Sequence, residues 1–257
     1  MLEQFRKAKE AEIAHLVALE ARGLLPQPRA GQRPSFVAGL KARYVPVIAE
    51  YKRASPSTGA INLEAEPEKV AAGYAKAGAG AISVLTEQTH FKGNMEFLDN
   101  MAGVGLPLLR KDFILHPLQI AQTAASPASA FLLIVRMVDD ALLGRLLESG
   151  RNHGLEAVVE VFDATDLRRA RQAGATIIQV NNRDLDTLKL DMSASRTLIS
   201  GKKNEEFWIT ASGIADAGIL ASLLSLGFDA ALIGSFLMGE QNPGQRLAAL
   251  IQGVGNV

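Results

Sequence analysis

Two lysines and two glutamates lie where short apolar runs of the sequence end, so their side chains could act as acids and bases. They are Glu50, Lys52, Lys111 and Glu160. Burying such charges costs on the order of several kcal/mol each unless they pair closely. Desolvation and a neighbouring cation are expected to lower the lysine pKa values toward the range of a general acid. The four residues together predict acid–base chemistry, although for any one of them a structural ion pair is the alternative.

A second group consists of small residues in the motifs ASGI (211–214) and IGSF (233–236). Its members are Ser212, Gly213, Gly234 and Ser235. Small residues let main-chain amides approach a ligand, and a helix N-terminus near each motif can hold an anion. Either motif alone is consistent with an ordinary turn. Because both follow neighbouring predicted strands, they predict a phosphate site.

Short apolar runs alternate with amphipathic stretches from Val45 onward. The runs are VPVIAEYK (45–52), AISVLT (81–86), PLLRKDF (107–113), AFLLIV (130–135), EAVVEV (156–161), TIIQVNN (176–182), FWITASG (207–213) and AALIGSF (230–236). Strand–helix units in this order specify a parallel sheet with right-handed crossovers. Closing eight of them into a barrel is the economical solution for roughly 215 residues, and a doubly wound open sheet is the alternative.

Residues 1–44 precede the first predicted strand and are expected to form a helix, a turn-rich segment and a short helix. They are too short for a core of their own, so we interpret them as a cap on the barrel. The sequence therefore predicts one α/β domain, a (β/α)₈ TIM barrel over residues 45–257 with an N-terminal helical extension. Chemistry in this fold takes place at the C-terminal ends of the strands, where both groups of candidate residues fall.

The composition excludes several classes of function. Lys and Arg together number 27, as do Asp and Glu, so the balanced charge gives no reason to expect nucleic acid or an acidic membrane as a partner. The absence of cysteine excludes disulfides and cysteine nucleophiles and is compatible with the cytoplasm. The four histidines show no ligand spacing, so no metal is assigned. The charged, amphipathic first residues are neither a secretory signal nor a membrane anchor.

Longer motifs resemble those of the indole-3-glycerol phosphate synthase family of tryptophan biosynthesis. They include IAEYKRASPSTG (48–59), AISVLTEQTHFKGNMEFL (81–98), LPLLRKDFILHPLQI (106–120), FLLIV (131–135), VVEV (158–161), NNRDLDT (181–187) and LIGSFLM (232–238). The resemblance extends from Arg43 to the end. It implies a carboxy-lyase that converts 1-(o-carboxyphenylamino)-1-deoxyribulose 5-phosphate into indole-3-glycerol phosphate, with loss of carbon dioxide and water and without a cofactor.

The resemblance also implies roles for the candidate residues. Lys111 would be the general acid that protonates the ribulose carbonyl while the aromatic carbon attacks it. Glu160 would stabilise the charged intermediate, and Glu50 would act as a base or as the partner of the lysines. Lys52 would hold the carboxylate or phosphate region, and Asn181 would bond the sugar and aniline region.

The resemblance also implies which residues contact the two ends of the substrate, its aromatic ring and its phosphate. The aromatic pocket would be lined by Ser55, Phe113 and Leu132. The phosphate would be bound, together with Lys52, by Ser212, Gly213, Gly234 and Ser235. The only partner this implies is a phosphorylated small molecule. The chain itself is expected to be a monomer, with association with other enzymes of the tryptophan pathway as the alternative.

Several positions depart from the family pattern. Ala211 stands where the family usually has Glu, Gln179 stands where Gly is common, and Phe236 replaces a small residue. Residues 121–130 also lack the usual Gly-containing turn. The missing acid at Ala211 supports a second interpretation, a divergent or catalytically weakened paralogue that binds a phosphate ligand. A third, phosphoribosylanthranilate isomerase or tryptophan synthase α, fits less well, because the isomerase relies on a cysteine base and RKDF does not fit the α subunit.

Overall fold

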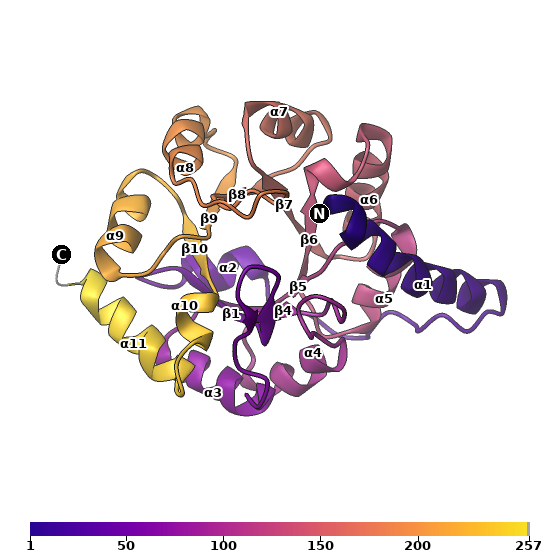
Figure 1. The fold of residues 1–257 in the computed structure, drawn as a ribbon. Helices are drawn as coiled ribbons and strands as arrows, with labels where there is room; N and C mark the ends of the chain where they lie inside the picture. The colour runs from indigo at the N-terminus through magenta and orange to yellow at the C-terminus, as the bar shows by residue number, and fades with distance from the viewer. Residues whose placement is uncertain (256–257) are drawn as a thin grey trace.

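Eight parallel strands close into a barrel in the computed structural model, which describes residues 1–255 (Figure 1). The strands are β1 (Val47–Tyr51), β4 (Ala81–Leu85), β5 (Leu108–Lys111), β6 (Ala130–Ile134), β7 (Glu156–Val161), β8 (Ile177–Asn181), β9 (Phe207–Ala211) and β10 (Ala230–Ile233). Each pairs with the next along the chain, and β10 pairs with β1 to close the ring. The predicted TIM barrel and all eight predicted strands are thereby confirmed.

Helices surround the barrel and return the chain from one strand to the next. They are α3 (Pro67–Ala77), α4 (Glu96–Met101), α5 (Pro117–Ala125), α6 (Asp140–Asn152), α7 (Ala164–Gln172), α8 (Ser193–Leu198), α9 (Ala217–Ser225), α10 (Ser235–Met238) and α11 (Pro243–Val254). Several begin at an acidic or amide side chain that accepts a hydrogen bond from a backbone amide of the first turn, as Asp139 and Asp216 do. These caps fix where each helix starts and thus how long each strand-to-helix loop is.

The first residues of the chain contact both ends of the barrel. Helix α1 (Leu2–Ala21) lies across the end at which the strands finish, and its far end projects beyond the barrel wall (Figure 1). Buried Lys9 of α1 forms an ion pair with Asp112 at 2.6 Å, beside the end of β5. Helix α2 (Phe36–Lys41) covers the opposite end, where Glu156 accepts the backbone amides of Phe36 and Val37.

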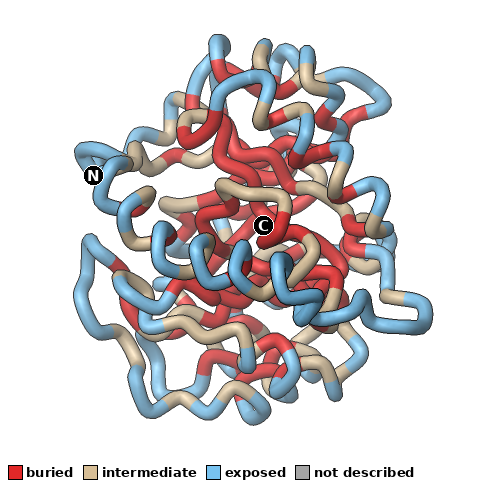
Figure 2. The backbone as a smooth tube through the Cα atoms, turned by 90° about the vertical axis from the view of Figure 1, so that its right-hand side faces the viewer, coloured by how far each residue is buried: buried red, intermediate tan, exposed pale blue. Residues whose placement is uncertain are grey.

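The core has one layer of side chains inside the barrel and another between the strands and the helices. Figure 2 shows the buried segments gathered in the middle of the molecule. Side chains alternate between these layers because successive residues of a strand point to opposite faces. Ile48 belongs to the inner layer, so Glu50, two residues later, also points inward and lies nearer the strand end. The same alternation directs Glu160 and Asn181 inward.

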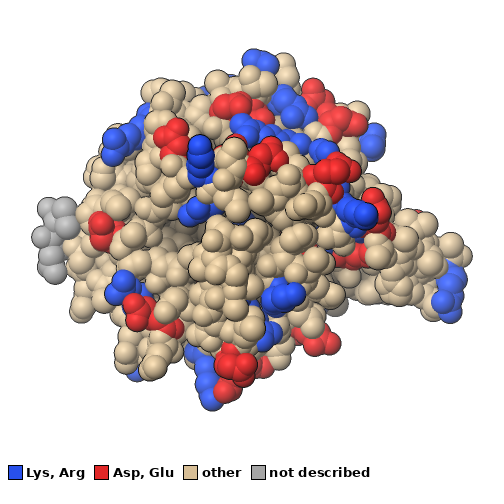
Figure 3. Space-filling model, viewed as in Figure 1, with Lys and Arg blue, Asp and Glu red and all other residues tan. Residues whose placement is uncertain are grey.

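The surface and the helices give two further observations. On the face seen in Figure 3, basic and acidic side chains are intermixed, as the equal numbers of the two kinds lead one to expect. Within residues 1–255, no helix is both long enough and apolar enough to cross a membrane.

Candidate active site

A cavity of about 500 Å³ opens at the C-terminal ends of the strands. Every residue proposed above as catalytic or substrate-binding lines it: Glu50, Lys52, Ser55, Lys111, Phe113, Leu132, Glu160, Asn181, Ser212, Gly213, Gly234 and Ser235. They come from seven strands or the loops that follow them, far apart in the sequence. The barrel therefore brings the predicted set to one place, while the role of each residue stays a prediction.

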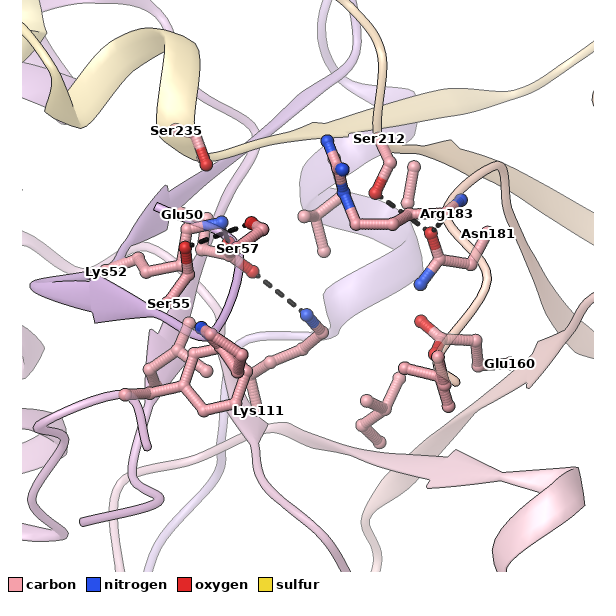
Figure 4. A pocket seen from close by; sticks show the side chains of 18 of the residues that line it. Glu50, Lys52, Ser55, Ser57, Lys111, Glu160, Asn181, Arg183, Ser212 and Ser235 are labelled. Carbon is pink, nitrogen blue, oxygen red and sulfur yellow. Dashed lines mark hydrogen bonds and ion pairs between the residues drawn. The ribbon is translucent and has the colours of Figure 1, made fainter. Parts of the chain in front are cut away.

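Glu50 lies between the two lysines (Figure 4). One carboxylate oxygen is 3.0 Å from Lys52 Nζ and the other is 3.1 Å from Lys111 Nζ. The carboxylate is 2% exposed, and burial alone would raise its pKa, but the two ammonium groups outweigh burial and lower the pKa to about 2. Glu50 is therefore an anion at any ordinary working pH. A carboxylate with so low a pKa is a weak proton acceptor, so Glu50 is better suited to be the ion-pair partner of the lysines than a general base.

Lys111 differs from the sequence-based expectation that its pKa would be lowered. Burial does act in that direction, but the carboxylates of Glu50 and Glu160 outweigh it and raise the pKa above 10.5. The expectation was wrong because composition and spacing cannot reveal that an anion lies 3.1 Å from Nζ. Lys111 is accordingly protonated throughout the neutral range, ready to donate a proton and to stabilise negative charge.

Glu160 is the second glutamate proposed as catalytic; it is 1% exposed, and its environment differs from that of Glu50. Both lysines pair with Glu50, whereas Glu160 accepts a hydrogen bond from the side-chain amide of Gln179. The side-chain amide of Asn181 also faces it (Figure 4). Burial raises the pKa of Glu160 above 4.5, and Lys111 and the two amides only partly offset this. Of the two glutamates, Glu160 is thus the one placed to accept and release a proton.

The small residues after β9 and β10 bring the backbone close to the cavity. Ser212 and Gly213 both adopt left-handed conformations, with φ of 70° and 85°. Successive residues of this kind can turn their amides toward one point and make an anion-binding concavity. A β-carbon on Gly234 would lie 2.3 Å from a carboxylate oxygen of Glu50, so only glycine leaves room for that side chain. Ser212 Oγ donates to Asn181 Oδ1 at 2.9 Å.

An apolar wall lies on the other side of the cavity. Phe113 stacks on Phe5 of α1 with ring centroids 4.3 Å apart, and Phe91 lies 6.1 Å from Phe113. Leu132 on β6 also lines the cavity, whereas Ser55 on β2 (Ala54–Ser55) lies beside Lys52 and Ser57 (Figure 4). A flat aromatic group of a ligand could therefore contact the rings and aliphatic carbons of Phe113 and Leu132.

Several residues that line the cavity were not proposed from the sequence, among them Phe5, Phe91 and Arg183. Phe5 lies outside the quoted motifs, Phe91 lies in the motif 81–98 without an assigned role, and only tertiary packing brings both to Phe113. Arg183 could have been found, since it follows Asn181 in NNRDLDT; its guanidinium donates to the backbone of Leu188 at 2.9 Å.

The departures from the family pattern lie in well-packed surroundings. Ala211 lines the cavity and pairs in register with Asn181, so it leaves space there without disturbing the strand. Phe236 packs against Arg246, whose guanidinium carbon is 4.1 Å from the ring centroid. In the segment 121–130, Ser126 accepts the amide of Ala128 and donates to Thr123, which closes the turn without glycine.

Comparison with known proteins identifies the family. The family described as "Indole-3-glycerol phosphate synthase" matches residues 2–250. The synthase of Aquifex aeolicus is 45% identical over 208 residues, which is 80% of each chain. That of Mycolicibacterium vanbaalenii is 40% identical over 245 residues, 95% of this chain and 88% of the relative. These names support the synthase rather than a weakened paralogue.

Solved structures agree on the fold. The 3-hexulose-6-phosphate synthase of Salmonella typhimurium aligns with a TM-score of 0.64 at 14% identity, over 82% of this chain and 99% of the other. At that identity the likeness concerns the barrel alone. The family match and the curated relatives carry the functional conclusion: the chain belongs to the indole-3-glycerol phosphate synthase family, whose members are carboxy-lyases of tryptophan biosynthesis.

Proposed function

We propose that the chain carries out the family's ring closure with a division of labour set by the environments of the two glutamates proposed as catalytic. The observation that carries this proposal is the contrast between Glu50, held by two lysines, and Glu160, held by amides. Pairs of carboxyl groups whose environments separate their pKa values take different parts in acid–base reactions. Production of indole-3-glycerol phosphate by the purified chain and by variants of these residues tests the proposal.

Lys111 is the general acid of the ring closure. As the aromatic carbon attacks the ribulose carbonyl carbon, the carbonyl oxygen takes the proton from Lys111 Nζ. Carbon dioxide then leaves, and the electron pair of the broken bond returns to the ring. Glu50 remains ionised and keeps both ammonium groups in place at 3.0 and 3.1 Å. Its contribution is positioning and charge balance.

Glu160 is the base of the dehydration that follows. Loss of water requires one group that accepts a proton from the substrate and one that gives a proton to the departing hydroxyl. The raised pKa of Glu160 makes it the better acceptor of the two glutamates, and Lys52 is the donor to the hydroxyl. Asn181, whose amide faces Glu160 (Figure 4), orients the sugar and aniline region between them.

The substrate spans the cavity from the apolar wall to the small residues. Its anthranilate ring contacts Phe113 and Leu132, and its phosphate lies against the amides of Ser212–Gly213 and Gly234–Ser235, with Lys52 nearby. The separation of an aromatic wall from a polar end fixes one direction of binding. We also propose that the chain acts as a single-domain monomer in the cytoplasm, with a phosphorylated small molecule as its partner.

We expect an inorganic anion to occupy the polar end in the absence of substrate. In crystals grown with sulfate or phosphate, the anion should lie within hydrogen-bond distance of the amides at Gly213 and Ser235, because left-handed residues and a helix start present N–H groups there. The measurement is the difference density at this position. An ordered anion at the α2 end of the barrel, with these amides vacant, would contradict the assignment.

Restoring an acid at Ala211 is expected to raise turnover. The Ala211→Glu side chain would enter the cavity beside Asn181 and supply a further proton acceptor. Since such a group acts on the transition state, kcat should rise about threefold or more while KM changes less. Steady-state kinetics of both forms across pH measure this. A slower Ala211→Glu enzyme would mean that the natural site already has its full set of bases.

A further inference from the structure

Gln179 is a fully buried polar residue that the mechanism above leaves without a role. It lies on β8, in register with Glu160 on β7, and its side-chain amide nitrogen donates to Glu160 Oε2. Its side chain points into the barrel, because Asn181, two residues later on the same strand, lines the cavity. The Gln179 amide therefore contacts the Glu160 carboxyl group from the barrel interior, on the side away from the opening of the cavity.

The carbonyl oxygen of the same side chain has no hydrogen-bond partner among residues 1–255. Leaving a buried acceptor unpaired is unfavourable, so proteins avoid it in an ordinary core. The side-chain amide of glutamine carries a hydrogen-bond donor (NH₂) and an acceptor (C=O) on the same terminal carbon, so both groups extend equally far from the backbone. A half-turn of the terminal torsion would bring the free oxygen to Glu160, where it could accept the O–H of the protonated acid.

The groups facing Glu160 explain why such support matters. Lys111 faces it from β5, Glu50 on β1 and Lys52 just after β1 lie across the cavity, and Arg183 follows β8. The adjacent strand β6 presents the apolar Ile134, and β9, on the far side of β8, presents Ala211. Since Lys52 and Lys111 both pair with Glu50, no ion pair among residues 1–255 fixes the direction of the Glu160 carboxyl group.

We propose that Gln179 is a positioning residue that holds the Glu160 carboxyl group toward Lys111 and Asn181 in both its ionised and its protonated form. It donates N–H to the carboxylate, and it accepts O–H after Glu160 has taken a proton from the substrate. The proton moves only between substrate and Glu160, and Gln179 exchanges none. This inference rests on the proposed role of Glu160 as the base.

The test removes the amide and measures the titration of Glu160 directly. In protein labelled with ¹³C at the glutamate carboxyl carbons, the Glu160 signal is the one absent from Glu160→Gln. In Gln179→Met, whose side chain has a similar length, the bond to the ionised form is lost, and that bond is the stronger of the two. The pKa of Glu160 should therefore rise by about one unit. Gln179→Leu removes the same amide with a different shape and should give the same shift.

Kinetics supply a second readout. The acid limb of kcat should move to higher pH by the same amount, and kcat at its optimum should fall about tenfold with KM changed less than about twofold. Gln119→Met is the matched control, because Gln119 is equally buried but does not line the cavity, and its side chain bonds to Glu12 and the backbone of Phe113 rather than to Glu160. It should lower the melting temperature and leave the Glu160 titration unchanged.

The outcomes separate this inference from the proposed function. An unchanged Glu160 titration in both Gln179→Met and Gln179→Leu would overturn the positioning role and reduce Gln179 to core packing. A shifted titration without any change in the pH dependence of turnover would support the contact but remove Glu160 from the role of base. The carboxyl signals require no turnover, so they report on Gln179 even if the enzyme is inactive.

Discussion

Lys111→Met should lower kcat/KM for ring closure by at least about a hundredfold, the effect typical of losing a positioned general acid. Methionine fills a similar volume but can neither donate a proton nor carry charge. The variant should fold, because Glu50, the ion-pair partner of Lys111, keeps its second ion pair with Lys52 and is not left as an uncompensated buried charge. Turnover is measured by product fluorescence, and folding by circular dichroism and thermal melting.

Lys76→Met is the matched control for this prediction. Lys76 is exposed on α3 and lies outside the residues that line the cavity, so the same substitution should leave turnover unchanged. A second consequence concerns Glu50, which keeps only Lys52 as a partner in the Lys111→Met variant. Its pKa should rise from about 2. Near-normal turnover of a folded Lys111→Met protein would remove Lys111 from the chemistry.

Glu160→Gln should also lower kcat by about a hundredfold or more, because the amide cannot accept the proton released during dehydration. In the natural enzyme the base must be ionised, so activity is present above the pKa of Glu160 and is lost as the pH falls through it. That pKa lies above 4.5 because burial raises it. Residual turnover of the variant should lack this acid limb, and the pH profile of kcat measures the difference.

Glu156→Gln is the matched control, since Glu156 lies on the same strand at the opposite end of the barrel. Its carboxylate accepts the backbone amides of Phe36 and Val37, so the substitution should lower the free energy of unfolding by about 1 kcal/mol while turnover persists. Glu160→Gln should melt no lower than the natural chain, because it removes a buried charge. An acid limb that survives in Glu160→Gln would assign the base to another residue.

The sequence allowed the barrel and the floor of the site to be predicted for a simple physical reason. Strand ends in a parallel barrel meet at one face, so Lys111 and Glu160 could be brought together from alternation alone. The same argument placed Ser212 and Ser235 just after the ends of two neighbouring strands, β9 and β10. None of this required knowledge of a single side-chain contact.

Charge pairing and aromatic packing could not be predicted in this way. The pKa of Lys111 depends on which carboxylate lies within about 3 Å, and that follows from side-chain torsions that periodicity does not encode. Phe5 reaches the cavity because α1 folds back over the barrel, held by the buried pair of Lys9 and Asp112. Asp112 lies in the predicted strand 107–113, but nothing in the spacing of the sequence pairs it with Lys9.

Gln179 illustrates the same limit in the site itself. In the sequence it appeared only as a departure from a small residue in a strand. In the structure its side-chain amide nitrogen donates to Glu160, and its side-chain carbonyl oxygen has no hydrogen-bond partner among residues 1–255. A polar residue inside a barrel becomes interpretable only when the atoms around it are known.

The central claim is that this chain closes the indole ring although Ala211 stands where the resemblance to the family leads one to expect an acid. The most direct measurement is steady-state formation of indole-3-glycerol phosphate from 1-(o-carboxyphenylamino)-1-deoxyribulose 5-phosphate by the purified natural chain, followed by product fluorescence together with released carbon dioxide. We expect both products in equal amounts, with no added metal or cofactor, and their loss in Lys111→Met. Binding of a substrate analogue without formation of either product would contradict the account.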